Sequence, residues 1–129
     1  MTYSIDRIVE GRGFDEVVAR TREELAKEGF GVLTEIDVKA TLKRKLGLDM
    51  RPYLILGACN PPLAHRVLEA EPHIGVLLPC NVVVRELEDG RVEVSAMDPE
   101  AAMRMIDNPV VHEVGREVRQ RLERVVAAV

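Results

Sequence analysis

NVVVRELEDGRVEVSA, residues 81–96, is the stretch that decides the fold. Two valine-rich runs, 81–88 and 91–96, flank Asp89-Gly90, which is the strongest turn signal in the chain. An Asp-Gly pair between two apolar runs is typical of a tight hairpin, because glycine readily takes the positive φ that such turns need. We therefore predict two adjacent antiparallel strands in the second half of the chain.

Strands and helices alternate before this hairpin. The apolar periodicity predicts strands at 3–10, 30–38 and 51–59, and helices at 14–28, 38–46 and 61–71. Asp37 is expected to cap the second of these helices, and Gly47 to end it. Residues 53–56 are continuously apolar, so we expect them to be buried on both faces near the sheet centre. Residues 73–79 fit no pattern.

Two further helices are expected after the hairpin. Asp98-Pro99 begins a short one that reaches about Ile106, and Asn108-Pro109 begins a longer one with an apolar stripe along it. Residues 125–129 are all apolar, and we expect them to pack on the sheet or on a partner subunit. This mixture of elements, with a late hairpin, predicts an α+β fold rather than a purely parallel α/β sheet.

Length and composition indicate one domain over residues 1–129. A chain of this size buries enough surface to need neither a disulfide nor a metal to hold its core. No apolar run approaches the roughly 18 residues of a membrane span, and no secretory signal is visible. Two cysteines in such a sequence favour a reducing cytoplasm. The charge-rich, amide-poor composition is compatible with a thermophilic source, and GC-rich coding would give the same bias.

The charge balance argues against nucleic acid as a partner. The net charge is −4, and only two tyrosines and two phenylalanines are available to stack on bases.

The best candidate site is GACNPP, residues 57–62, where a strand ends and a helix starts. Asn60 is a good N-cap, and Pro61 suits the first helical position. A helix N-terminus carries unpaired N–H groups and a partial positive charge, which lower the pKa of a nearby thiol and attract anions. Cys59 is the thiol in question.

Cys80 stands just before the hairpin and can reach the same end of the sheet. The helix after Cys59 runs back by roughly 16 Å, and residues 73–80, when extended, cover about 26 Å. The two cysteines can therefore form a shared site or a disulfide. The alternative is that they are two small, buried hydrophobic residues, as free cysteines often are.

Other motifs are weaker. Neither CxxC nor HxxxH spacing is present, so no metal site is predicted. His65 and His112 fit solvated helix faces, whereas His73 is the histidine best placed to act as a base for a cysteine. Gly11-Arg12-Gly13 lacks the third glycine of a dinucleotide-binding loop. The basic stretch 39–51 is either an anion site or a solvated face.

CNP at 59–61 and LLPC at 77–80 together resemble domain-of-unknown-function family 302. Residues 29–39 and 94–99 resemble it too, and the likeness extends over about residues 3 to 125. The resemblance implies a small prokaryotic domain with a curved antiparallel sheet packed on helices, similar to the TATA-binding-protein-like fold, and a homodimer. It implies no established activity.

Three hypotheses follow. The first is a binding module that holds a small ligand, or a redox-sensitive thiol pair, at Cys59, Asn60, Pro61 and Cys80, with His73 nearby. The second is an enzyme in which Cys59 is the nucleophile and His73 the base. The third is a structural homodimer without a small-molecule site. None of them calls for a cofactor, a metal, a nucleic acid or a membrane.

Overall fold

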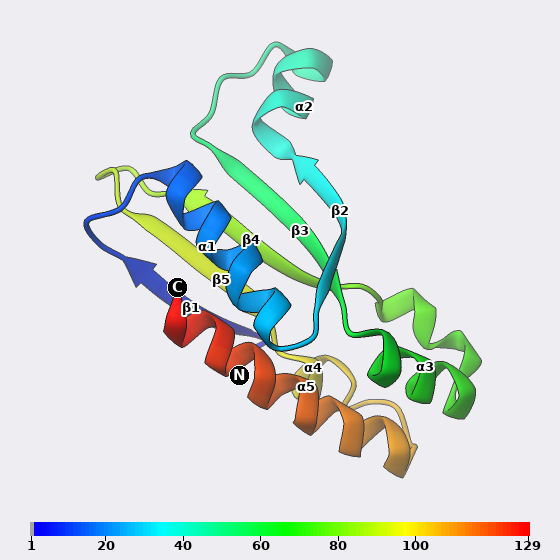
Figure 1. Ribbon diagram of the computed structural model, residues 1–129. Coiled ribbons are helices and arrows are strands. Elements are labelled where there is room, and N and C mark those ends of the chain that lie inside the picture. Colours follow the sequence, from blue (N-terminus) through cyan, green and yellow to red (C-terminus); the bar gives the residue numbers. More distant parts are fainter. Residues whose placement is uncertain (1) are drawn as a thin grey trace.

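The predicted hairpin is formed by β4 (Cys80–Glu86) and β5 (Val92–Met97). In the turn between them Gly90 has a φ of 88°, the conformation that favours glycine. Val84 lies directly opposite Val94 in this pair. The computed structural model, shown in Figure 1, describes residues 2–129.

The hairpin is the middle of an open, five-stranded antiparallel sheet. The strand order is β1-β5-β4-β3-β2, in which β1 is Ser4–Val9, β2 is Gly31–Asp37 and β3 is Tyr53–Cys59. Every pair of neighbours is antiparallel. The predicted α+β class is confirmed, with a sheet that is packed against helices and does not close into a barrel.

One face of this sheet is covered by two long helices, α1 (Phe14–Lys27) and α5 (Pro109–Ala128), as Figure 1 shows. The core forms between the sheet and these helices. Every second residue of a strand points to the helical side, and cross-strand neighbours such as Leu56 and Val82 are buried there together. The expected apolar stripe of the last helix is confirmed, since each residue of it from Val111 to Val125 is buried. No helix among residues 2–129 is long and apolar enough to cross a bilayer.

The predicted burial of residues 53–56 on both faces is wrong. Leu54 and Leu56 are buried under the helices, whereas Tyr53 and Ile55 are only partly buried on the opposite face. The helices pack on one side only, and β3 lies next to the edge strand β2 rather than at the centre. A continuous apolar run therefore does not require two covered faces here.

Helix α2 (Val38–Leu46) has the ends that the sequence predicts. The Asp37 side chain accepts a hydrogen bond from the Ala40 N–H at 2.9 Å, and Gly47 ends the helix with a φ of 65°. The helix lies beyond the ends of β2 and β3 and buries none of its residues (Figure 1).

The segment after α3 (Pro61–Ala70) is a 3-10 helix, η1 (Pro72–Leu77), and a cis peptide bond follows between Leu78 and Pro79. The short helix after the hairpin, α4 (Pro99–Ala102), is shorter than predicted. Its remaining turns to Ile106 are held by single backbone hydrogen bonds.

The apolar C-terminus packs on its own chain. Val125, Val126 and Val129 are buried, and α5 contacts β1. Arg7 on β1 donates through Nη1 to the carbonyl oxygens of Val126, Ala127 and Val129, at 3.1, 2.8 and 3.1 Å. The last carbonyls of a helix have no partner within the helix, so this arginine satisfies them.

Deletion of residues 125–129 is expected to lower the free energy of unfolding by about 4 kcal/mol or more, because three buried valines are lost. Urea unfolding followed by circular dichroism measures the change. The exposed Ala127→Ser variant serves as the control and should differ little from the parent. Equal stability of the deletion variant and the parent would contradict this account of the C-terminus.

Candidate functional site

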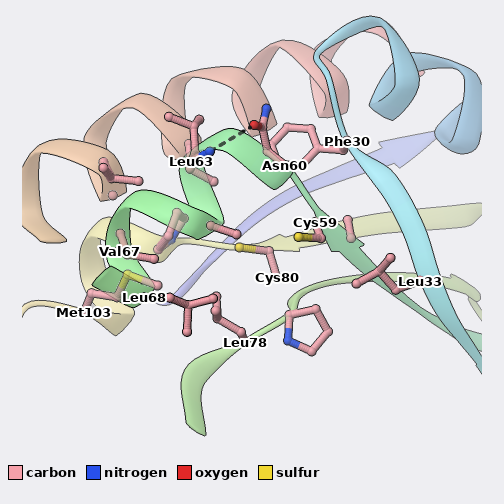
Figure 2. Close-up of a pocket in the computed structure, with 17 residues that line it drawn as sticks. Phe30, Leu33, Cys59, Asn60, Leu63, Val67, Leu68, Leu78, Cys80 and Met103 are labelled. Carbon is pink, nitrogen blue, oxygen red and sulfur yellow. Dashed lines mark hydrogen bonds between the residues drawn. The ribbon is translucent and has the colours of Figure 1, made fainter. Parts of the chain in front are cut away.

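An apolar cavity of about 310 Å³ opens where β3 ends and α3 begins, and we call it the β3–α3 cavity (Figure 2). Its wall combines residues from β2, β3, α3, β4, α4 and α5. The side chains that give it its apolar character include Phe30, Leu33, Leu63, Val67, Leu68 and Met103. Asn60 and the two cysteines are its polar or weakly polar members.

Cys59 and Cys80 both line this cavity (Figure 2). Cys59 is the last residue of β3 and Cys80 is the first of β4, and Ala58 lies directly opposite Cys80. Strand geometry then separates the Cα atoms of the two cysteines by roughly 6 Å. Cys59 is half-buried and Cys80 is buried, and both thiols are free. The sheet register thus brings the two sequence-predicted thiols together.

Burial, and to a smaller extent the charge interaction with neighbouring Cys59, raises the pKa of the Cys80 thiol to about 11. Removal from water disfavours the charged form of a thiol. Cys80 is therefore a neutral thiol at physiological pH, and a neutral thiol is a poor nucleophile.

Asn60 caps α3, as predicted, and is 7% exposed. Its Oδ1 accepts from the Leu63 N–H at 3.4 Å, and its Nδ2 donates to the Glu28 carbonyl at 3.3 Å. Arg121 on α5 donates to the same carbonyl at 2.8 Å. The amide therefore joins the end of α1 to the start of α3, and its own hydrogen bonds are made within the protein.

The start of α3 does not offer the anion site that the sequence suggested. Pro61 and Pro62 have no N–H, the Leu63 N–H bonds to Asn60 Oδ1, and the Ala64 N–H bonds to the Asn60 carbonyl at 2.8 Å. The first-turn donors that bind anions elsewhere are thus missing or used. Pro61 itself is exposed and does not line the cavity.

The loop before Cys80 passes close to β3 because residue 57 is glycine. A Cβ at Gly57 would lie 2.2 Å from Thr34 Oγ1 and 2.9 Å from Pro79 Cγ. Any larger residue would push Thr34 or Pro79 away. Gly57 therefore sets the position of Pro79, and with it the cavity wall that precedes Cys80.

His73 does not reach the cavity, so the predicted pairing of Cys59 with a His73 base is not formed. The His73 side chain is 97% exposed, and its Nδ1 lies 3.4 Å from Glu71 Oε1. It follows α3, which carries the chain roughly 15 Å away from Cys59. His65 is exposed and pairs with Glu69, as expected for a solvated face.

His112 was expected to be solvated, and this expectation is wrong for one ring nitrogen. Its Nε2 is buried and has no hydrogen-bond partner among the described residues. In the basic stretch, Lys43 pairs with Asp49 at 2.9 Å on the surface, as a solvated face would. Within residues 2–129 no group of three or more His, Cys, Asp or Glu side chains is placed to hold a metal ion.

Sequence reasoning missed most of the apolar wall. Leu33, Leu68 and Met103 come from three different elements, and only the tertiary fold brings them together. Gly115 on α5 is also part of the wall, where a Cβ would lie 3.5 Å from the Pro99 carbonyl oxygen. Leu68 on α3 is 39% exposed, and a large apolar side chain in partial contact with water is a feature that marks a binding cleft.

The fold and the cavity define a class: an open antiparallel sheet with helices on one face and an apolar pocket at a strand-to-helix turn. The family model "Domain of unknown function DUF302" matches residues 7–129, so the chain belongs to that family. The expected family membership is confirmed.

A solved relative has the same architecture. The chain is similar to an uncharacterized conserved protein DUF302 from Bacillus stearothermophilus, whose crystal structure gives a TM-score of 0.91 at 32% identity. The match covers 99% of this chain and 98% of that one. No curated protein matches. The comparisons thus identify a family and a fold, and they indicate no specific activity.

The raised pKa of Cys80 predicts a loss of stability in alkali. Above its ordinary pKa of 9.0 the unfolded thiol ionises while the folded one stays neutral up to about 11. The contribution of the neutral Cys80 thiol to the free energy of unfolding is therefore fully present below pH 9. It falls by about 2–3 kcal/mol as the pH rises to 11. Urea unfolding at several pH values, on the parent and on Cys80→Ala, measures it. If the free energies of unfolding of the parent and of Cys80→Ala change by the same amount from pH 8 to 11, Cys80 is not desolvated in the folded protein.

Proposed function

We propose that the protein binds a small, uncharged, largely apolar ligand in the β3–α3 cavity. The observation that carries this proposal is the cavity itself, about 310 Å³ in volume and lined almost wholly by apolar atoms. An apolar cavity of about 150 Å³ holds a benzene molecule. Twice that space suits an aromatic compound of two or three rings or a medium-length alkyl chain.

The polar groups of the wall favour a neutral ligand. The Asn60 amide already has its partners, and the Cys80 thiol is neutral. Among residues 2–129, no acidic or basic side chain lines the cavity. A buried charge without a partner is costly, and a charged organic ligand would find no charged side chain to pair with here. Because His73 lies away from Cys59, binding has more support than cysteine-nucleophile catalysis.

The mouth of the cavity supports the same proposal. Leu33 is 67% exposed and Leu68 is 39% exposed, and both line the opening (Figure 2). Large apolar side chains that stay in water beside a cavity are typical of ligand-binding clefts. A ligand that covers Leu33 and Leu68 would make apolar contacts at the rim in addition to those inside the cavity.

We further propose a reducing, cytoplasmic setting for this function. Both thiols are free, and Cys80 contributes to the wall as a neutral thiol. A reducing compartment keeps such a pair in this form.

The probe N-phenyl-1-naphthylamine, which is neutral and fluoresces in apolar surroundings, is expected to bind once per chain. Ala64→Phe places a ring in the cavity and should weaken binding about tenfold or more. Leu33→Ala, at the exposed rim, should weaken it less without any risk to the fold. Fluorescence titration measures both.

Ala26→Phe adds the same ring to the exposed side of α1 and is the matched control. It should leave binding unchanged. The proposal fails if the parent shows no saturable binding, or if a folded Ala64→Phe variant binds as tightly as the control.

A second candidate is a homodimer that uses α2. This nine-residue helix buries none of its residues, and Leu46 and Leu48 near its end are 72% and 48% exposed. Helices this short rely on packing for stability. The helix also has four basic residues and no acidic one, whereas the whole chain has a net charge of −4. A second, acidic copy of this chain is therefore a complementary partner, and we propose it as the one that covers α2.

Leu46→Glu is expected to convert the dimer to a monomer, because it places a charge in the proposed apolar contact. Sedimentation velocity measures the mass. Met105→Glu changes an equally exposed side chain, at 82% exposure, that lies away from α2 and should leave the dimer intact. A monomeric parent protein would rule this interface out.

A further inference from the structure

The β3–α3 cavity contains sulfur ligands but, among residues 2–129, no carboxylate or imidazole ligand. Cys59, Cys80 and the thioether of Met103 all line it. Magnesium and calcium need several oxygen ligands, and structural zinc sites take four protein ligands. Thiolate and thioether groups instead select soft ions such as Cu(I). The composition of the wall therefore excludes the common metals and fits a soft one.

Both thiols lie at the wall of one cavity before any ligand arrives (Figure 2). Cys80 begins β4 opposite Ala58, and Cys59 is the next residue of β3. Cys59 also lies opposite Gly31 of β2, so its backbone is fixed between two strands. A site whose ligands are already ordered does not lose conformational entropy when it binds. Two thiolate ligands are enough for a Cu(I) ion, which needs no carboxylate or imidazole as a third ligand.

Cys80 is buried in the core at 6% exposure, and among residues 2–129 its sulfur has no hydrogen-bond partner. A thiol that lines a cavity and makes no hydrogen bond within the protein is available to a ligand. This observation is independent of the apolar volume on which the proposed function rests.

We propose that Cys59 and Cys80 bind one Cu(I) ion as a two-coordinate dithiolate at the wall of the β3–α3 cavity. Two S–H bonds break, two Cu–S bonds form, and two protons are released to solvent. No oxidant or reductant takes part. The complex has one net negative charge, and because Cys59 is only half-buried, that charge keeps partial contact with water. The ion needs only the two sulfur atoms, so this proposal stands apart from the apolar ligand.

The test is an anaerobic competition titration against bicinchoninate, whose coloured Cu(I) complex fades as the protein takes the ion. We expect one Cu(I) per chain, together with a thiolate-to-copper absorption in the ultraviolet. Cys59→Ser and Cys80→Ser should each weaken binding by about 100-fold or more, because a hydroxyl is a poor ligand for a soft ion.

A relocated thiol separates this site from adventitious binding to any two cysteines. Cys80→Ser/Asn81→Cys keeps two thiols, but residue 81 is exposed and lines a different hollow, together with Tyr53 and Ser95. It should bind as weakly as Cys80→Ser. Parent-like affinity in this variant, or a parent protein that leaves the bicinchoninate complex intact, would overturn the copper site. N-phenyl-1-naphthylamine titration of the same samples shows separately whether the apolar cavity binds.

Discussion

The antiparallel pairing of β3 with β4 is the constraint on which the site depends. It sets Ala58 opposite Cys80 and Gly57 opposite Asn81. A slip of one residue would move every side chain of one strand to the other face of the sheet. The same register places Leu56 and Val82 side by side under the helices. The core and the cysteine pair are therefore produced by one set of backbone hydrogen bonds.

Local signals explain why so much of the fold could be predicted. Asp37 and Asn60 accept hydrogen bonds from the first turns of their helices, and Gly90 takes the positive φ of the turn. These signals act within a few residues, so a single sequence contains them. Burial of β3 was predicted wrongly because the number of covered faces depends on where α1 and α5 pack. A continuous apolar run in the sequence does not indicate on which face of the sheet the helices pack.

The site was predictable in part, for the same reason. Cys59 and Asn60 were found from a strand-to-helix turn, and Cys80 from the reach of the chain. The predicted anion site fails because Pro61 and Pro62 remove the very donors that a helix start supplies. His73 was taken to lie near the thiols because the conformation of residues 73–79 was unknown. The 3-10 helix there leaves its ring in water.

The hydrogen bonds around the Glu28 carbonyl have a consequence for motion. Asn60 and Arg121 donate to the same oxygen, so the end of α1, the start of α3 and the middle of α5 meet at one atom. The cavity has α3 and α5 in its wall. It can therefore widen at this end only if these bonds stretch together, and α1 has to follow. Opening is then a concerted event rather than the swing of one helix, and such events occur on microsecond or slower timescales. Any widening of the cavity at this end therefore involves α1, α3 and α5 together.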